Sequence, residues 1–198
     1  NPSLSAEQGE DEETRTEQSR SSDFSLAAAW ALAQDPYSFA TSHPQAEALI
    51  KQQSITIRLF SNNTRWNGFV EWATFLGIGA YVNNRLVLNP WFALETVLEK
   101  VFHGRLELPF REFLADLAEA LPILDGGRYR QIVGDQTAQP WRTFRENEIS
   151  PCLSLGLRTL HEKKVLRLEP RSDAPQCTLL GRDGRDLFTF SHAVRVLS

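Results

Sequence analysis

Methionine is absent from the 198 residues, and cysteine occurs only twice, at Cys152 and Cys177. Because an initiator methionine is missing, we expect the sequence to be a piece of a longer chain. Two cysteines are too few for a disulfide framework, so we interpret both as small buried thiols. The sequence also lacks an apolar run of about eighteen residues and a basic-then-apolar leader, which indicates a cytoplasmic protein without a membrane span.

Hydrophobic residues make up 41% of the chain and charged residues 23%, which is typical of one or two globular domains. This composition excludes a fully disordered or fibrous chain. Negative charge is concentrated at the start, where residues 1–23 carry a net charge of −5 against +1 for the rest. Because that segment has few large apolar side chains, the sequence predicts residues 1–22 to be an acidic disordered tail or linker.

Three helices and a hairpin are predicted in the first half of the chain. A helix from Phe24 to Leu32 ends before Asp35-Pro36, because the residue before a proline avoids the α region, and a short polar helix follows within residues 36–54. An apolar stripe at helical spacing predicts the third helix, and it consists of Trp66, Phe69, Val70, Ala73 and Leu76.

Trp72 and Phe75 lie off this stripe, so we expect the third helix to be covered on more than one side. Gly77 and Gly79 end the helix. Residues 80–88 then form a hairpin, because Asn83 and its neighbour tolerate the left-handed conformations of a tight turn.

Proline marks the starts of the remaining helices. Pro90 begins a helix that closes at Gly104, and Pro109 begins another that is ended by Pro122. Residues 128–133 fit a short helix or a strand, and this alternative stays open.

Ser150-Pro151 combines an N-cap residue with proline at the first helical position, and the helix that it begins runs to about Lys164. Three strands are predicted after it, at residues 165–169, 176–180 and 186–190.

A helix, a turn, a helix and a β hairpin in that order are typical of a winged helix, and this order occurs twice. The sequence therefore predicts an α+β fold, mostly α with small β hairpins, built from tandem winged-helix-like domains. The expected domains are residues 23–105, a helical domain with a small hairpin, and residues 106–198, a C-terminal winged-helix domain.

The spacing of chemically active residues favours no catalytic or metal site. Gaps of 9, 16 and 15 positions separate Cys152, His161, Cys177 and His192, so no close pair pre-forms half a zinc site. Gly77-Ile78-Gly79 lacks the third glycine of a dinucleotide loop. We therefore expect no enzyme activity, no cofactor, no metal and no small-molecule substrate.

The outward face of the last helix and its wing is the predicted DNA-binding surface. Ser154, Arg158 and His161 are the residues expected to approach base edges or phosphates. Side chains expected to hold the phosphate backbone are Lys163, Lys164, Arg167, Arg171, Arg182 and Arg185. Leu155 and Glu162 also face outward on this helix, which suits a groove reader poorly, so the alternative that these cations only solvate the fold stays open.

Several strings of this sequence resemble the DpdG family of the bacterial Dpd systems. The strings are residues 29–36 (AWALAQDP), 64–69 (TRWNGF), 75–77 (FLG), 121–127 (LPILDGG) and 150–157 (SPCLSLGL). The resemblance covers residues 24–197 and leaves the acidic tail outside. Dpd systems place 7-deazaguanine derivatives in DNA and restrict DNA that lacks them. The resemblance therefore implies a defence component that works beside helicase or nuclease subunits, and it carries over no catalytic residue.

Three functions follow as hypotheses. The first is a non-catalytic tandem winged-helix protein that binds DNA or organises a DNA-targeting defence complex. The second is a protein-interaction adaptor that contacts no DNA and presents Leu155, Trp72 or Phe75 to a partner. The third, a nuclease subunit, has no motif to support it.

Overall fold

The computed structural model describes residues 23–83 and 85–196. In its first half, residues 23–32 are helical, which confirms the predicted helix from Phe24 to Leu32. The elements that follow are α2 (His43–Gln52), α3 (Asn63–Phe75), β1 (Gly79–Val82) and β2 (Arg85–Leu88). The predicted short polar helix, third helix and hairpin are therefore confirmed.

Aromatic packing joins the helical segment 23–32 to α3. The ring of Phe60 lies 5.8 Å from that of Trp30 and 5.1 Å from that of Trp66, measured between centroids. Asn62 begins α3, because its side chain accepts a hydrogen bond from the backbone N–H of Arg65. Gly77, at φ +70°, ends α3 in the left-handed region that glycine adopts without strain.

The prediction that α3 is covered on more than one side is wrong. Trp66, Phe69 and Ala73 are buried, but Trp72 is 56% exposed and Phe75 77% exposed. One face of α3 packs on the helical segment and the hairpin, and no described element lies over the opposite face.

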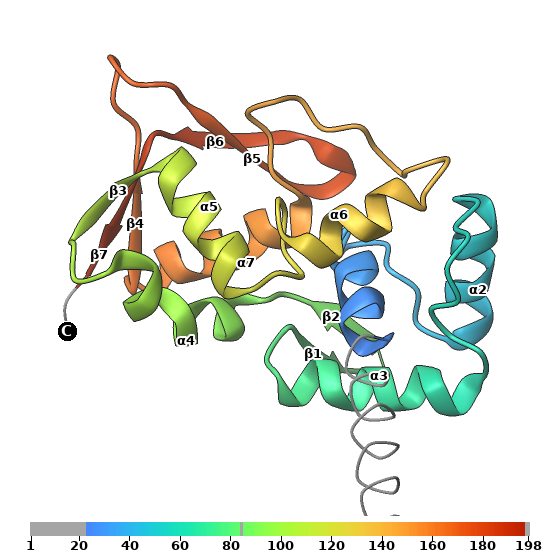
Figure 1. Cartoon of the computed structure of the whole chain (residues 1–198). Coiled ribbons are helices and arrows are strands. Elements are labelled where there is room, and N and C mark those ends of the chain that lie inside the picture. Colours follow the sequence, from blue (N-terminus) through green and yellow to red (C-terminus); the bar gives the residue numbers. More distant parts are fainter. Residues whose placement is uncertain (1–22, 84, 197–198) are drawn as a thin grey trace, which may run out of the picture.

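The second half of the chain holds four helices and five strands among the described residues (Figure 1). Residues 128–133 belong to a helix, which decides the alternative that the sequence left open. The elements are α4 (Trp91–Phe102), β3 (Glu107–Pro109), α5 (Phe110–Ala120), α6 (Arg128–Asp135), α7 (Pro151–Glu162), β4 (Leu166–Glu169), β5 (Cys177–Leu180), β6 (Asp186–Phe190) and β7 (His192–Arg195), with a short 3-10 turn at Arg182–Gly184.

α7 lies at the centre of this half and packs on α4, β4 and β5 (Figure 1). Ser150 begins it as predicted, since its hydroxyl accepts the N–H of Leu153. The thiol of Cys152 contacts the carbonyl of Gln34 at 3.4 Å, which ties α7 to the segment after the first helix. As a result α7 is buried along most of its length.

The three strands predicted after the last helix do not form one three-stranded sheet. β7 lies between β3 and β4 in one antiparallel sheet, and β5 pairs with β6 in a separate hairpin. The sequence prediction missed β3 and β7, because a three-residue strand and a strand that follows another without a turn residue carry no local signal.

Helices and small antiparallel sheets make the fold α+β, as predicted. Buried residues on both sides of position 105 form one hydrophobic cluster, and α4 packs on α5 and α7. The division into domains at this position stays a prediction, and the predicted tail at residues 1–22 lies outside the described residues. In the part of the chain that the structure describes, every helix is too short or too polar to cross a membrane.

Candidate functional site

Ser154 is fully buried, so the prediction that it faces solvent is wrong. Its hydroxyl contacts the carbonyl of Ile149 at 3.4 Å and accepts the N–H of Leu180 at 2.9 Å. These bonds join α7 to β5 on the side that helix geometry alone assigned to solvent. The hairpin that covers this side comes from more than twenty residues later, so the periodicity of α7 contains no sign of it.

Three other predicted contact residues around the end of α7 already have partners within the chain. Arg158 pairs with Glu162 at 2.7 Å, and this hydrogen bond raises the pKa of Arg158. His161 accepts the N–H of Leu168 at its Nδ1 atom. The ammonium group of Lys163 lies 4.4 Å from the centre of the Trp91 ring, a cation–π distance.

Arg167 and Arg171 lie at the sheet of β3, β7 and β4, and each contacts a carboxylate. Arg167 pairs with Glu169 at 2.9 Å, and Arg171 pairs with Glu107 at 2.6 Å. The exposed face of this sheet is therefore of mixed charge rather than basic.

Arg182 and Arg185 flank the turn between β5 and β6. Arg182 lies 3.9 Å from the carboxylate of Asp183, whose backbone N–H donates to Asp35 at 3.0 Å. Arg185 and Lys164 are exposed and have no ion-pair partner among the described residues.

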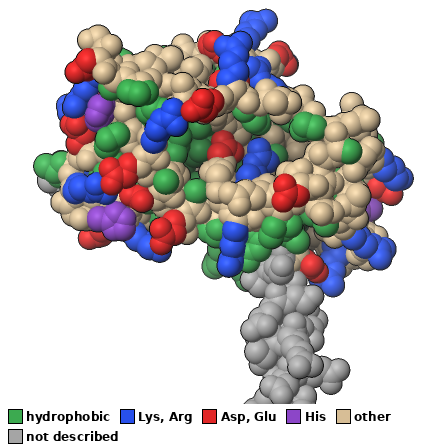
Figure 2. Space-filling model, turned by 45° about the horizontal axis from the view of Figure 1, so that its top comes forward, with side chains coloured by type: hydrophobic (Ala, Val, Ile, Leu, Met, Phe, Trp, Pro, Cys, Tyr) green, Lys and Arg blue, Asp and Glu red, His purple; other side chains and the backbone are tan. Residues whose placement is uncertain are grey.

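The predicted cations thus lie on α7, on the sheet and at a separate hairpin turn, and most of them are paired. On the face in Figure 2, basic and acidic side chains are interspersed. Paired charges attract phosphates less than free ones, so a DNA-binding role for these residues stays a prediction.

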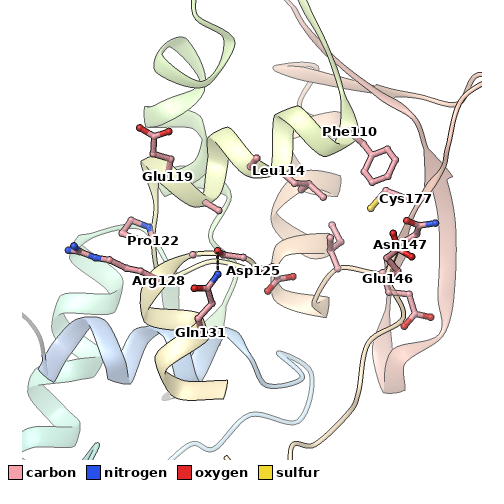
Figure 3. A pocket seen from close by; sticks show the side chains of 16 residues that line it. Phe110, Leu114, Glu119, Pro122, Asp125, Arg128, Gln131, Glu146, Asn147 and Cys177 are labelled. Atoms are coloured by element: carbon pink, nitrogen blue, oxygen red, sulfur yellow. Dashed lines mark hydrogen bonds between the residues drawn. The ribbon is translucent and has the colours of Figure 1, made fainter. Parts of the chain in front are cut away.

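A groove of about 940 Å³ opens between α5, the turn at residues 122–127, the start of α6 and the extended segment 146–149 (Figure 3). Phe110, Leu114 and Cys177 give it an apolar wall. Glu119 and Arg128 border its far end. Figure 2 shows a hollow on this side, with hydrophobic side chains inside and charged groups near them. No local sequence pattern predicts this groove, because its walls come from five separate segments, Cys177 of β5 included.

Asp125 and Glu148, two of the carboxylates that line the groove, are held by partners within the chain. Asp125 accepts the N–H of Ser150 and lies 3.5 Å from Arg130. Burial raises the pKa of Glu148, but the Arg145 N–H and the Arg142 guanidinium outweigh it, so the pKa falls below its usual value. Burial raises the pKa of the Cys177 thiol to about 12, so this thiol is protonated at neutral pH.

Exposed apolar side chains at the end of α3 and the start of α4 form a second surface, which we call the α3 patch. It consists of Trp72, Phe75, Leu76 and Phe92. The rings of Trp72 and Phe75 lie 5.6 Å apart in an edge-to-face arrangement. Large apolar side chains that are exposed and contiguous mark interaction sites on soluble proteins.

Gly77 lies where the α3 residues of the patch meet Phe92 of α4. Its carbonyl accepts the N–H of Ala93, and a Cβ at this position would lie 2.5 Å from the Phe92 ring. The ring of Phe92 therefore lies directly after the end of α3. On the following hairpin, Val82 and Val87 add exposed apolar side chains.

Comparison with known families matches residues 3–174 to the family described as DpdG-like. The chain belongs to the DpdG-like family. This membership confirms the resemblance seen in the sequence and links the chain to the Dpd system. No curated protein and no solved structure matches this chain.

The extent of the DpdG-like match differs from the expected one. It begins at residue 3, so it includes most of the acidic segment that the resemblance was expected to leave out. It ends at residue 174, so β5, β6 and β7 lie beyond it. The α3 patch lies entirely inside the DpdG-like region, as does the groove apart from Cys177.

Proposed function

We propose that this chain is a non-catalytic, tandem winged-helix-like subunit of a Dpd system that organises the DNA-targeting complex by binding protein. Helicase or nuclease subunits of the same system, in the cytoplasm, are the expected partners. The observation that carries the proposal is the exposed aromatic face of α3, where Trp72 is 56% and Phe75 77% exposed. Such side chains form the centres of protein interfaces, where their burial supplies most of the binding energy.

The order of elements supports two winged-helix-like units. The helical segment 23–32, α2 and α3 precede the β1–β2 hairpin. In the second unit β3, α5, α6 and α7 precede β4 and β7, and β7 lies between β3 and β4. In this arrangement α3 and α7 hold the position of the helix that enters the major groove in a DNA-binding winged helix.

Neither helix has a surface suited to a DNA groove. α7 is covered by α4 and β5, and its Arg158 is paired with Glu162. α3 presents Trp72 and Phe75, whereas groove readers present donors and acceptors to base edges. The same helix position is suited instead to an apolar protein surface.

The groove supports the non-catalytic part of the proposal. A nucleophile needs an adjacent base or a lowered pKa, but the pKa of the Cys177 thiol is raised and Glu148 is held by two arginines. Purified protein incubated with divalent metal and unmodified DNA tests this part. Cleavage that survives further purification would contradict it.

The experiment for the binding role is co-purification of the tagged chain from cells that carry the complete Dpd operon. We expect the wild-type chain to retain at least one other Dpd protein and the Trp72→Asp/Phe75→Asp variant to lose it. DNA binding is measured in parallel on the purified chain, because direct DNA binding is the alternative. Strong retention of duplex DNA by the chain alone, with no Dpd protein bound, would favour that alternative.

A further inference from the structure

Gly68 lies in the interior of α3, where glycine is among the least favourable residues for a helix. A Cβ at this position would meet no atom of residues 23–83 or 85–196 within 4 Å, so packing against these residues does not require glycine. Its φ is not in the left-handed region, so the backbone does not require it either. A glycine here leaves room for a second backbone to approach α3 closely.

Gly68 lies on the exposed face of α3 that carries the aromatic residues. Gly68, Trp72 and Phe75 are spaced four and three positions apart, so they share one side of the helix. A helix that crosses α3 at Gly68 would approach closely there and would cover Trp72 and Phe75 on one side of the crossing. This geometry fits a helix as the element that covers the α3 patch.

The charged residues on either side of Gly68 have opposite signs, so two antiparallel copies of α3 would place opposite charges next to one another. Arg65 lies three residues before Gly68 and Glu71 three residues after it, and both are exposed. Neither has an ion-pair partner within the described ranges, and a separation of six positions keeps them from pairing along one helix. A two-fold axis at Gly68 relates two antiparallel helices so that Arg65 of one copy lies level with Glu71 and Trp72 of the other.

We infer that the α3 patch binds a second copy of this chain, with two α3 helices crossing antiparallel at Gly68. This inference rests on the proposed function, because the dimer formed through α3 would be the form of the chain that holds the other Dpd proteins, and loss of the dimer would release them. Each copy contributes Arg65 to the carboxylate of Glu71 and to the ring of Trp72 on the other copy, so both contacts form twice. The resulting dimer presents two equivalent sets of surfaces to the other components of the complex.

The first test is sedimentation velocity of the purified chain over a hundredfold range of concentration. We expect a monomer–dimer equilibrium for the wild type and a monomer for Gly68→Leu, because the leucine fills the crossing point, and its Cβ has no described atom within 4 Å. Gly134→Leu is the matched control, since Gly134 lies in α6 and a Cβ there also meets no atom within 4 Å. The control is expected to dimerise like the wild type.

The second test exchanges the charges. Arg65→Glu and Glu71→Arg are each expected to weaken the dimer by roughly tenfold, because each places like charges opposite one another. The double exchange is expected to restore the wild-type affinity. Circular dichroism of each variant checks that the helices are intact.

Either of two results would overturn the inference: a wild-type chain that is monomeric throughout the concentration range, or a Gly68→Leu variant that still dimerises. The proposed function is judged separately. A monomeric chain that still captures another Dpd protein through Trp72 and Phe75 would leave that function in place and remove only the second copy as partner. A third result would contradict both the α3 dimer and the proposed function: a single-stranded oligonucleotide that binds the wild-type patch and does not bind the Trp72→Asp variant.

Discussion

The carboxylate of Asp125 accepts the backbone N–H of Ser150, the residue that begins α7, at 2.5 Å. The same carboxylate lies 3.5 Å from Arg130, whose guanidinium donates to the carbonyl of Ala29 at 3.3 Å. One acidic side chain at the edge of the groove therefore connects the start of α7 to α6 and to the helical segment 23–32.

Replacement of Asp125 is expected to destabilise the fold. In Asp125→Ala the N–H of Ser150 and the guanidinium of Arg130 lose their acceptor in a partly buried site, which costs about 2 kcal/mol of unfolding free energy. Urea unfolding measures this loss. Asp135→Ala is the control, because Asp135 is exposed, and a loss of the same size there would show that the Asp125 contacts are not responsible.

Gly184 is expected to tolerate substitution less well than Gly104. Both have positive φ, +68° and +78°, so alanine at either position costs about 1–2 kcal/mol in backbone strain. At Gly184 a Cβ would also overlap the guanidinium of Arg142, which donates to the Gly184 carbonyl at 2.7 Å, whereas at Gly104 it meets nothing within 4 Å. Thermal unfolding of the two alanine variants compares them, and equal losses would contradict the packing of Arg142.

Stability is expected to fall as the pH rises above about 9. Burial and the nearby Asp125 carboxylate raise the pKa of Cys177 to about 12, while the thiol in the unfolded chain loses its proton near its ordinary value. Between these values the folded state binds more protons, so the unfolding free energy decreases by about 1.4 kcal/mol per pH unit for this thiol. Cys177→Ala should lessen the slope, and urea unfolding at several pH values measures it.

Charge reversal on the predicted DNA face is expected to have little effect on DNA retention. Arg158 is paired with Glu162, Lys163 lies over Trp91, and Arg182 is at a separate turn. Fluorescence anisotropy with a duplex oligonucleotide compares the wild type with the triple variant Arg158→Glu/Lys163→Glu/Arg182→Glu. The comparison covers a range of salt concentration. A large loss of affinity together with a flatter salt dependence would show that these cations bind phosphates after all.

The sequence predicted most elements of the fold, because their signals are local. Pro90 and Ser150 mark helix starts, and Gly77 and Gly104 mark helix ends, whatever lies elsewhere in the chain. The positions of β3 and β7 depend on pairing between segments that are more than eighty residues apart, and no local pattern contains that information.

The surfaces were harder to predict than the elements. The burial of Ser154 depends on β5, and the exposure of Trp72 depends on the lack of a covering element among the described residues. Trp72 and Phe75 lie off the apolar stripe of the third helix, and this position is the signal of the α3 patch in the sequence. Helical periodicity tells which residues share a face, but only the tertiary structure tells whether that face is covered.

If this chain acts through protein contacts made by α3, loss of the exposed aromatic residues of α3 should release its partners. Co-purification from cells with the whole Dpd operon measures this, with Trp72→Asp/Phe75→Asp compared with Ile132→Asp, which changes an exposed apolar residue of α6. We expect the α3 variant to lose the other Dpd proteins while the Ile132 variant keeps them. Full retention of those proteins by a folded α3 variant would contradict a role of α3 in these contacts.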